Sequence, residues 1–209
     1  LEHLIEQKMS PREFEIVIVD DGSMDGTQEE LLKRLEQLGT HNVTLVYFPR
    51  VKPRQMGDGQ FRAGIARNLG IKHTSGEFLS FLDSDILVPP NYLEVVIEEL
   101  QSADLLQARR LNLSKDTSAQ EKVEYLNMVE SDLIPDEKYW EDFNKIPSWE
   151  SVEHPWKYVC THSLSIRKET LRQVGGFKNC FICLVGESTW RSHCINYLQP
   201  FITRVTARI

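Results

Sequence analysis

Two carboxylates, Asp83 and Asp85, stand one residue apart just after an apolar run that is typical of a buried strand. Alternate residues of an extended chain point to the same side, so both side chains face one point if that geometry persists. Two hard oxygen ligands at one point suit Mg²⁺ or Mn²⁺, with diphosphate oxygens and water completing the shell. The same pair fits a solvated turn, or a helix N-cap before Pro89–Pro90, equally well, and these interpretations stay open.

A second acidic cluster runs from Val19 to Thr27 and has the sequence VDDGSMDGT. An EF-hand loop beginning at Asp21 would need Glu at its twelfth position, where this chain has Leu32, so a calcium loop is excluded. The Asp, Ser and Gly residues also favour a tight turn in which side chains satisfy backbone amides. That turn leaves the adjacent carboxylates of Asp20 and Asp21 unexplained, and they become candidate ligand-binding groups.

A third candidate binding segment is basic: Arg62 and Arg67 lie near the start of an expected helix. Guanidinium groups and the backbone amides of a helix N-terminus both attract anions, so this segment suits a phosphate. An ordinary solvated basic face explains the same residues and, taken alone, is the better interpretation.

Strand and helix patterns alternate through the first half of the chain and place these candidates. Strands are expected over 14–19, 43–48, 78–82 and 104–108, and helices over 1–9, 28–38, 61–73 and 91–100. This alternation predicts an α/β fold with a mostly parallel, Rossmann-like sheet flanked by helices on both faces. Ligands collect at the carboxyl ends of strands in such sheets, and both acidic clusters follow a strand there.

The ends of several helices can also be read from the sequence. Thr27 is expected to cap the helix over 28–38, and Gly39 is expected to end it. In the second half, helices are expected over 121–133 and 168–174, with a strand over 158–166. Gly175 and Gly176 then stop the last of these helices.

Composition narrows the function classes. The chain has 209 residues and a net charge of −7, from 24 Lys and Arg against 31 Asp and Glu. This acidic balance argues against a nucleic-acid partner, which needs clustered Lys and Arg. No apolar run approaches the roughly 18 residues that a transmembrane helix needs. The four Cys residues, with one C-x-x-C at Cys180–Cys183, fit free thiols better than disulfides or zinc, so a cytoplasmic location is expected.

Taken in order, the motifs resemble those of the family-two inverting nucleotide-sugar glycosyltransferases, which have a GT-A fold. The matching segments are VDDGSMDGT at 19–27, ARNLG at 66–70, SGEFLSFLDSD at 75–85 and VGGF at 174–177. The resemblance is strong over residues 14–91, moderate over 158–177 and thin elsewhere. The ordered combination is far more specific than any single motif.

The resemblance implies a role for each matched position. Its nucleotide-sugar-binding residues are Asp20, Asp21, Ser23, Arg67 and Asp83, and Asp85 would bind Mg²⁺ or Mn²⁺ at the diphosphate. In such enzymes the acceptor hydroxyl attacks the anomeric carbon in line and expels a nucleoside diphosphate, whose charge the metal offsets. A carboxylate general base takes the acceptor proton.

Two departures from the family pattern stand out. Family members begin with a strand that forms one wall of the nucleotide pocket, whereas this chain starts at the following helix, so that first strand is expected to be missing. After VGGF the family shows an acidic pair whose Asp is the general base, but here Glu187 is followed by Ser188. Glu187 is the expected catalytic base because its longer side chain reaches further, and His193 is a second candidate.

The chain is expected to form one domain with two halves. Residues 1–110 would bind the nucleotide sugar, and residues 111–209 would form the acceptor side, with an atypical tail from about residue 178. Trp140, Trp149 and Trp156 belong to the acceptor half, where packing of a loop-rich lobe is favoured over stacking on a sugar.

The resemblance implies metal-assisted transfer of a sugar, with inversion, to a glycan, lipid-linked or protein acceptor. The alternative is a non-catalytic or truncated homologue that binds nucleotide weakly and transfers nothing. The expected location is the cytoplasm, with peripheral attachment to the inner face of the membrane as a variant of that expectation.

Overall fold

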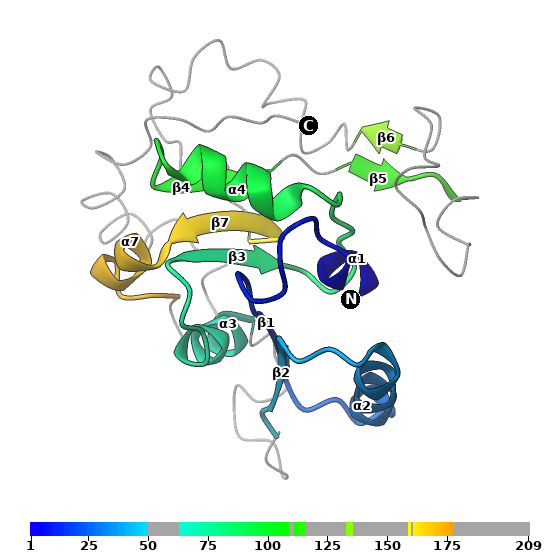
Figure 1. The fold of residues 1–209 in the computed structure, drawn as a ribbon. Helices are drawn as coiled ribbons and strands as arrows, with labels where there is room; N and C mark the ends of the chain where they lie inside the picture. The colour runs from blue at the N-terminus through cyan, green and yellow to red at the C-terminus, as the bar shows by residue number, and fades with distance from the viewer. Residues whose placement is uncertain (50–62, 109–110, 116–132, 136–158, 160, 178–209) are drawn as a thin grey trace.

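The computed structural model describes residues 1–49, 63–108, 111–115, 133–135, 159 and 161–177 (Figure 1). Its helices are α1 (Glu2–Ile5), α2 (Thr27–Leu38), α3 (Ala63–Lys72), α4 (Tyr92–Leu100) and α7 (Lys168–Gln173). Its strands are β1 (Ile16–Asp20), β2 (Val43–Tyr47), β3 (Phe78–Leu82), β4 (Leu105–Gln107), β5 (Leu111–Leu113), β6 (Leu133–Pro135) and β7 (Ser163–Arg167). Strands and helices therefore alternate along the chain as far as β4.

The strands form three groups. β1 and β2 pair in parallel, from Ile16 opposite Val43 to Asp20 opposite Tyr47. β7 lies between β3 and β4 and runs antiparallel to both, so β3 and β4 share one direction. β5 and β6 form a separate antiparallel pair. The expected α/β class is confirmed, and β7 departs from the expected parallel pairing, since it runs antiparallel to both of its neighbours.

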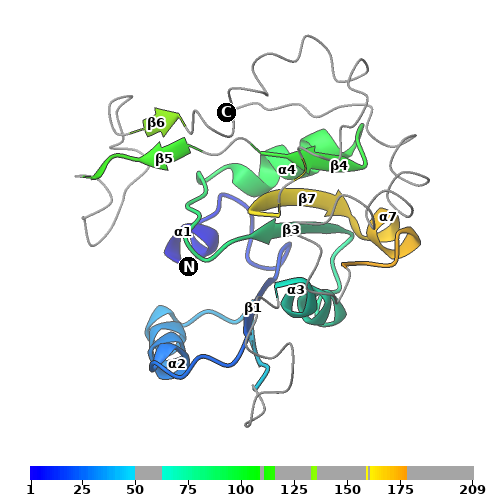
Figure 2. The same ribbon diagram turned by 180° about the vertical axis from the view of Figure 1, so that it is seen from behind.

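The β3–β7–β4 sheet carries the core on both of its faces, with α4 on one side and α3 and α7 on the other (Figures 1 and 2). The cluster on the α7 side consists of Leu79, Leu105, Leu164, Ile166 and Leu171. The cluster on the α4 side consists of Val88, Tyr92, Val96, Leu100 and Leu106. Burying each such side chain contributes about 1.5–3 kcal/mol, so the two clusters together anchor the sheet that contains β3.

Hydroxyl groups join the sheet to α4 within this core. The Ser80 Oγ atom lies 2.5 Å from the Tyr92 hydroxyl and 2.8 Å from the Ser165 Oγ atom. Burial raises the pKa of Tyr92 even though hydrogen bonds to Ser165 and Ser80 act in the opposite direction. The phenol therefore stays protonated and gives the buried network a donor.

The elements of the first half follow the sequence closely. β3 has the predicted bounds, and the strands expected over 43–48 and 104–108 are present with shorter bounds. The strand expected over 14–19 begins later, at Ile16, and extends one residue further, to Asp20. Gly39 ends α2 as predicted, with φ of 61°. Thr27 is not the N-cap, because α2 already begins at Thr27 and Gly26 occupies the cap position with φ of 90°.

Other boundaries differ more. α1 ends at Ile5, and β7 begins at Ser163 because a turn occupies residues 161–162. The helix expected over 121–133 is wrong at Leu133, which starts β6 and pairs with Leu113, and its other residues lie outside the described part of the chain. A three-residue strand made by tertiary pairing has too short a pattern to be recognised in the sequence.

Among the residues that the structure describes, no helix combines the length and the apolar composition needed to cross a membrane.

Candidate functional site

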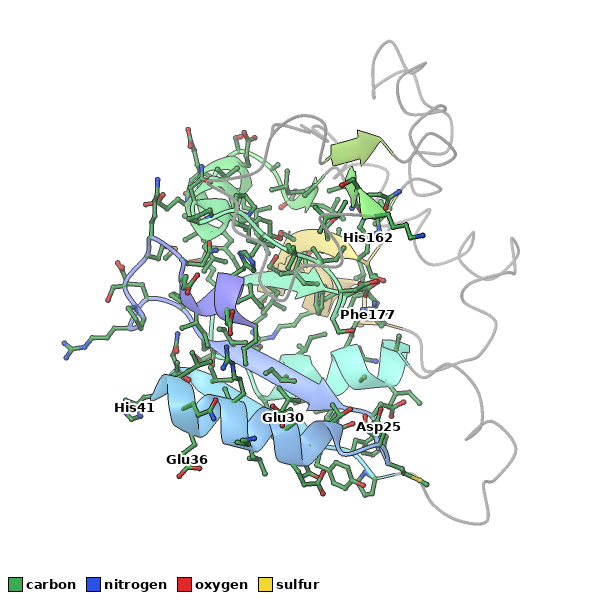
Figure 3. The ribbon with its side chains drawn as sticks, turned by 90° about the vertical axis from the view of Figure 1, so that its right-hand side faces the viewer. Asp25, Glu30, Glu36, His41, His162 and Phe177 are labelled. Carbon is green, nitrogen blue, oxygen red and sulfur yellow. The ribbon has the colours of Figure 1, made fainter. Side chains whose placement is uncertain are left out.

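The two acidic clusters lie at the carboxyl ends of β1 and β3, and α3 connects them. α3 packs closely on β1, since a Cβ atom on Gly70 would lie 3.4 Å from a methyl group of Val19. The same helix carries Arg67, which reaches Asp83 after β3. Figure 3 shows Asp25, Phe177 and His162 along one side of the molecule, with His41 on the opposite side. Each acidic cluster thus lies at the carboxyl end of a strand, as the sequence predicts.

The Asp20 carboxylate, in the first cluster, is held by a hydrogen bond within the turn that follows β1. Its Oδ1 atom accepts a hydrogen bond from the Ser23 backbone N–H at 2.8 Å, and Gly22 has φ of 79°, which suits the turn. The Asp20 side chain is buried, and its Oδ2 atom has no hydrogen-bond partner among the described residues. A buried carboxylate oxygen is unfavourable without a donor, so Asp20 Oδ2 is available to accept an N–H or O–H group from a ligand.

Asp25, later in the same cluster, forms hydrogen bonds with Thr27, the first residue of α2. The Asp25 Oδ1 atom accepts hydrogen bonds from the Thr27 hydroxyl at 2.5 Å and the Thr27 backbone N–H at 3.2 Å. These bonds hold the pKa of the exposed Asp25 below its usual value. Asp21 is half-buried, whereas Ser23 is exposed. Asp25 thus has a structural partner, and the side chains of Asp21 and Ser23 border the turn.

Asp83 in the second cluster is held by groups from other elements. Arg67 Nη2 donates to Asp83 Oδ1 at 3.0 Å, and the Asp83 backbone N–H donates to the His162 carbonyl at 3.2 Å. The Arg67 side chain is 17% exposed and that of Asp83 46%. The carboxylate is therefore oriented while remaining open to a ligand.

The segment from Asp83 to Ile86 turns rather than continuing as a strand. The Ile86 backbone N–H donates to the Asp83 carbonyl at 3.1 Å, and Ser84 and Asp85 occupy the turn. The extended geometry that would put Asp83 and Asp85 on one side does not persist, because this hydrogen bond closes a four-residue turn. Both carboxylates are exposed in that turn.

The oxygen donors fit a metal that is shared with a ligand rather than enclosed by protein. Within the described residues, no group of three or more His, Cys, Asp and Glu side chains could hold a metal ion. Asp83 is paired with Arg67, which leaves the exposed Asp85 as the available hard ligand. Mg²⁺ typically binds one or two carboxylates together with phosphate oxygens and water, and this donor set agrees with that arrangement.

Asn68 joins the α3 motif to the glycine turn after α7, and sequence reasoning gave it no role. The Asn68 side chain donates to the Phe177 carbonyl at 2.5 Å and accepts from the Phe177 N–H at 2.9 Å. The Phe177 ring packs edge-on to Phe81 at 5.0 Å, and the Arg67 guanidinium lies 5.8 Å from its centre. Residues 109 positions apart carry no pairing signal in a single sequence.

Several sequence-based candidates lie outside the described residues. They are Arg62, Trp140, Trp149, Trp156, Glu187, Ser188 and His193. The prediction that Glu187 is the catalytic base therefore stays a prediction.

Curated relatives of this chain include sugar transferases. It is 24% identical over 198 residues to a validoxylamine A glucosyltransferase of Streptomyces hygroscopicus subsp. limoneus, covering 88% of this chain and 41% of that protein. It is 31% identical over 91 residues to the poly(ribitol-phosphate) beta-N-acetylglucosaminyltransferase TarP of Staphylococcus aureus, covering 44% of this chain and 24% of TarP. The chain spans about half the length, or less, of the first curated relatives that it matches.

Solved structures show the fold. The mannosyltransferase PcManGT from Pyrobaculum calidifontis, in complex with GDP-Man and Mn²⁺, aligns with a TM-score of 0.56 and 19% identity, covering 85% of this chain and 42% of that one. TarS of S. aureus aligns with a TM-score of 0.53 and 18% identity, covering 84% of this chain and 26% of TarS. The GT-A fold expected from the motifs is confirmed.

A family model agrees with the motifs and with the fold. The model described as Glycosyl transferase family 2 matches residues 1–174, which include both acidic clusters, α3 and α7. The chain therefore belongs to glycosyl transferase family 2.

Proposed function

We propose that this protein transfers a sugar, with inversion, from a nucleoside-diphosphate sugar to a glycan, lipid-linked or protein acceptor. The observation that carries the proposal is the Arg67–Asp83 pair, which orients an open carboxylate at the end of β3. Membership of glycosyl transferase family 2 supports it, as does the packing of α3 against β1, which brings the Asp20 cluster to the same helix. A similar fold has been solved with GDP-Man and Mn²⁺.

In the proposed site, the β1 cluster binds the nucleoside. Asp20 Oδ2 accepts a hydrogen bond from the base or the ribose, which satisfies its buried oxygen. Asp21 and Ser23 border the turn and contact the same part of the donor. Arg67 of α3 holds Asp83 toward the ribose or sugar.

In the same proposal, Asp85 would hold Mg²⁺ or Mn²⁺ together with oxygens of the donor diphosphate. When bound, the ion would supply positive charge to offset the negative charge of the departing nucleoside diphosphate. Asp85 suits this role because it is exposed at the end of the turn, and no ion pair within the described part of the chain involves its carboxylate. Described residues supply too few ligands for a closed cage, so nucleotide and metal would bind together.

The transfer step then needs a proton acceptor. The acceptor oxygen forms a bond to the anomeric carbon as the bond from that carbon to the diphosphate oxygen breaks. The acceptor hydroxyl proton passes to the Glu187 carboxylate in the proposed mechanism. General-base assistance of this kind typically contributes about 10²–10⁴ in rate. We propose that this transfer takes place in the cytoplasm or, for a lipid-linked acceptor, at the inner face of the membrane.

A panel of nucleotide sugars tests the activity. UDP-, GDP- and dTDP-sugars are incubated with the protein and Mn²⁺, and release of nucleoside diphosphate is measured with and without oligosaccharide acceptors. The proposal predicts release from one nucleotide class and, by NMR, a product whose anomeric configuration is inverted. Retention of configuration would contradict the inverting mechanism.

The second candidate is a homologue that binds nucleotide and transfers nothing, and Ser188 favours it. Ser188 stands where the family resemblance places the general base, and a serine hydroxyl is a poor base at neutral pH. Slow donor hydrolysis needs the metal site but no acceptor, so hydrolysis without transfer would support this candidate. A Ser188→Asp variant that gained transfer would identify position 188 as the site of the lost base.

A further inference from the structure

We infer that Asn68 is a positioning residue, which orients Asp83 for donor binding through the Phe177 turn and Arg67. This inference rests on the proposed function, since it assigns Asp83 to the nucleotide sugar. The residues form a continuous chain of contacts from the glycine turn after α7 to the carboxylate after β3. Neither Asn68 nor Phe177 is placed against the donor itself.

The first contact in this chain is a two-point bond. The Asn68 side-chain amide presents a donor and an acceptor to the Phe177 backbone, and both hydrogen bonds form. The amide therefore acts as a neighbouring strand would, and it fixes the peptide of Phe177 in position and in orientation. Two bonds determine an orientation that a single bond would leave free.

The second contact is between rings and the guanidinium. Phe177 packs edge-on against Phe81 of β3, with ring centres 5.0 Å apart and an angle of 84° between the rings. Arg67 lies over the Phe177 ring at 5.8 Å, within the range of cation–π attraction. The ring therefore supports the guanidinium from one side while Asp83 engages it at 3.0 Å. Loss of the ring's position would release Arg67 and, with it, the 46% exposed side chain of Asp83.

The glycine turn is built around Asn68. Gly175 and Gly176 have φ of 81° and 75°, and each would be strained by a side chain. A Cβ atom on Gly176 would lie 2.9 Å from Asn68 Oδ1, whereas a Cβ atom on Gly175 would meet nothing within 4 Å. Gly176→Ala therefore displaces the Asn68 amide, and Gly175→Ala adds similar backbone strain without that clash. The pair forms a matched test.

The first arm of the experiment needs no ligand. Solvent exchange of the Arg67 guanidinium protons is measured by NMR in the free full-length protein, with the signals assigned by Arg67→Lys. We expect exchange about threefold or more faster in Asn68→Ala and Gly176→Ala than in wild type and Gly175→Ala. Equal exchange in Gly176→Ala and Gly175→Ala would overturn the inference. Failure of Gly176→Ala to fold, judged by circular dichroism, leaves Asn68→Ala to decide.

The second arm measures coupling to the donor. Affinities for UDP and GDP with Mn²⁺ are determined for Asn68→Ala, Asp83→Asn and the double variant. Asn68→Ala should lower the affinity for whichever nucleotide binds by about fivefold. In the Asp83→Asn background, Asn68→Ala should cause no further loss of affinity. If the fold-losses of the two single variants multiply in the double variant, Asn68 acts on nucleotide binding independently of Asp83, which would contradict the inference. If neither nucleotide binds wild type, the proposed function fails while the exchange arm still decides the role of Asn68.

Discussion

The two acidic clusters are held in opposite ways. At the end of β1, Asp20 is buried and bonded to an amide three residues away, so its geometry belongs to a single turn. At the end of β3, Asp83 is exposed and is held by Arg67 of α3 and by the carbonyl of His162 before β7. The first carboxylate is fixed locally, whereas the second depends on elements from distant parts of the chain.

This difference has consequences for what each cluster can tolerate and do. A buried, locally fixed carboxylate presents one oxygen in one place, which suits the recognition of a nucleoside. Exposed carboxylates can adjust to a diphosphate and its metal, provided that their supports keep them oriented. We therefore expect changes at the β1 turn to lower both stability and nucleotide affinity, and changes around β3 to weaken nucleotide and metal binding with little effect on stability.

The largest expected effect is at Asp85. Asp85→Ala should remove the Mn²⁺-dependent part of nucleotide affinity, a loss of about a hundredfold in Mn²⁺, and leave metal-free affinity unchanged. Because Asp85 is exposed, the free energy of unfolding should change by less than about 0.5 kcal/mol. Titration calorimetry and urea unfolding check these values. Glu36→Ala makes the same charge change on α2, away from the site (Figure 3), and an equal loss there would refute a specific role.

Arg67 tests whether support from α3 matters. Arg67→Ala should weaken nucleotide binding by about tenfold, because a charge-assisted hydrogen bond to Asp83 is lost along with the positive charge. Nucleotide titrations in Mn²⁺ measure this loss. Arg172→Ala removes an equal charge from an exposed position of α7 and should bind as wild type does. Similar losses of nucleotide affinity in both variants would show that the effect comes from net charge rather than from the contact with Asp83.

Gly22 tests the local construction of the β1 turn. Gly22→Ala should lower the free energy of unfolding by about 1–2 kcal/mol, since a Cβ atom strains a residue with φ of 79°. Denaturant unfolding gives the value. Gly39→Ala is the control for backbone strain outside the site. Gly39 has φ of 61°, and a new Cβ atom there would have no atom within 4 Å. Nucleotide affinity should fall only in the Gly22 variant, and a fall in both would contradict a local effect.

Glu15 links the starts of the two strands that carry the clusters, and its substitution should have the smallest effect. Its Oε1 atom accepts hydrogen bonds from the Ser75 N–H, the Ser75 hydroxyl and the Gly76 N–H, joining the start of β1 to the approach of β3. Burial acts to raise the pKa of Glu15, but these bonds and the charge of Lys168 outweigh it and lower the pKa below its usual 4.5. The side chain is exposed, so solvent screening keeps its contribution to about 1 kcal/mol or less.

The pH dependence follows from the lowered pKa. Stabilisation by Glu15 is complete above the unfolded-state value near 4.5 and is lost as pH falls through the lower folded-state pKa. Glu15→Gln should therefore be less stable than wild type at pH 7 and approach it below pH 4.5 in urea unfolding. The exposed Glu98→Gln serves as the control. A difference for Glu15→Gln that persisted unchanged at low pH would contradict this account.

The sequence predicts the local features better than the distant ones. Residues 78–82 form the expected strand because an apolar run bounded by polar turns has few alternatives. Gly39 ends α2 as expected, and the Asp20–Ser23 turn follows from Asp, Gly and Ser in succession. The turn after β3 was one of the alternatives that the sequence left open, because the hydrogen bond from the Ile86 amide to the Asp83 carbonyl, which closes it, has no signal in the sequence.

Distant contacts explain most of the other differences. The bond between Asn68 and Phe177, like the pairing of β5 with β6, joins segments whose separate patterns reveal no partner. α2 differs in another way, since Leu31, Leu32, Leu35 and Leu38 have the spacing of one helix face, yet no residue of α2 is buried and Leu32 is 52% exposed. Periodicity predicts that a helix is amphipathic and does not predict how closely a neighbour covers it.

The central claim is that the two clusters form one metal-dependent nucleotide site. Titration calorimetry of the folded full-length protein with UDP, GDP and dTDP, with and without Mn²⁺, tests it most directly. We predict that at least one nucleoside diphosphate binds and that Mn²⁺ strengthens this binding by about a hundredfold. Absence of binding for all three nucleotides, or an affinity that Mn²⁺ does not change, would contradict the account.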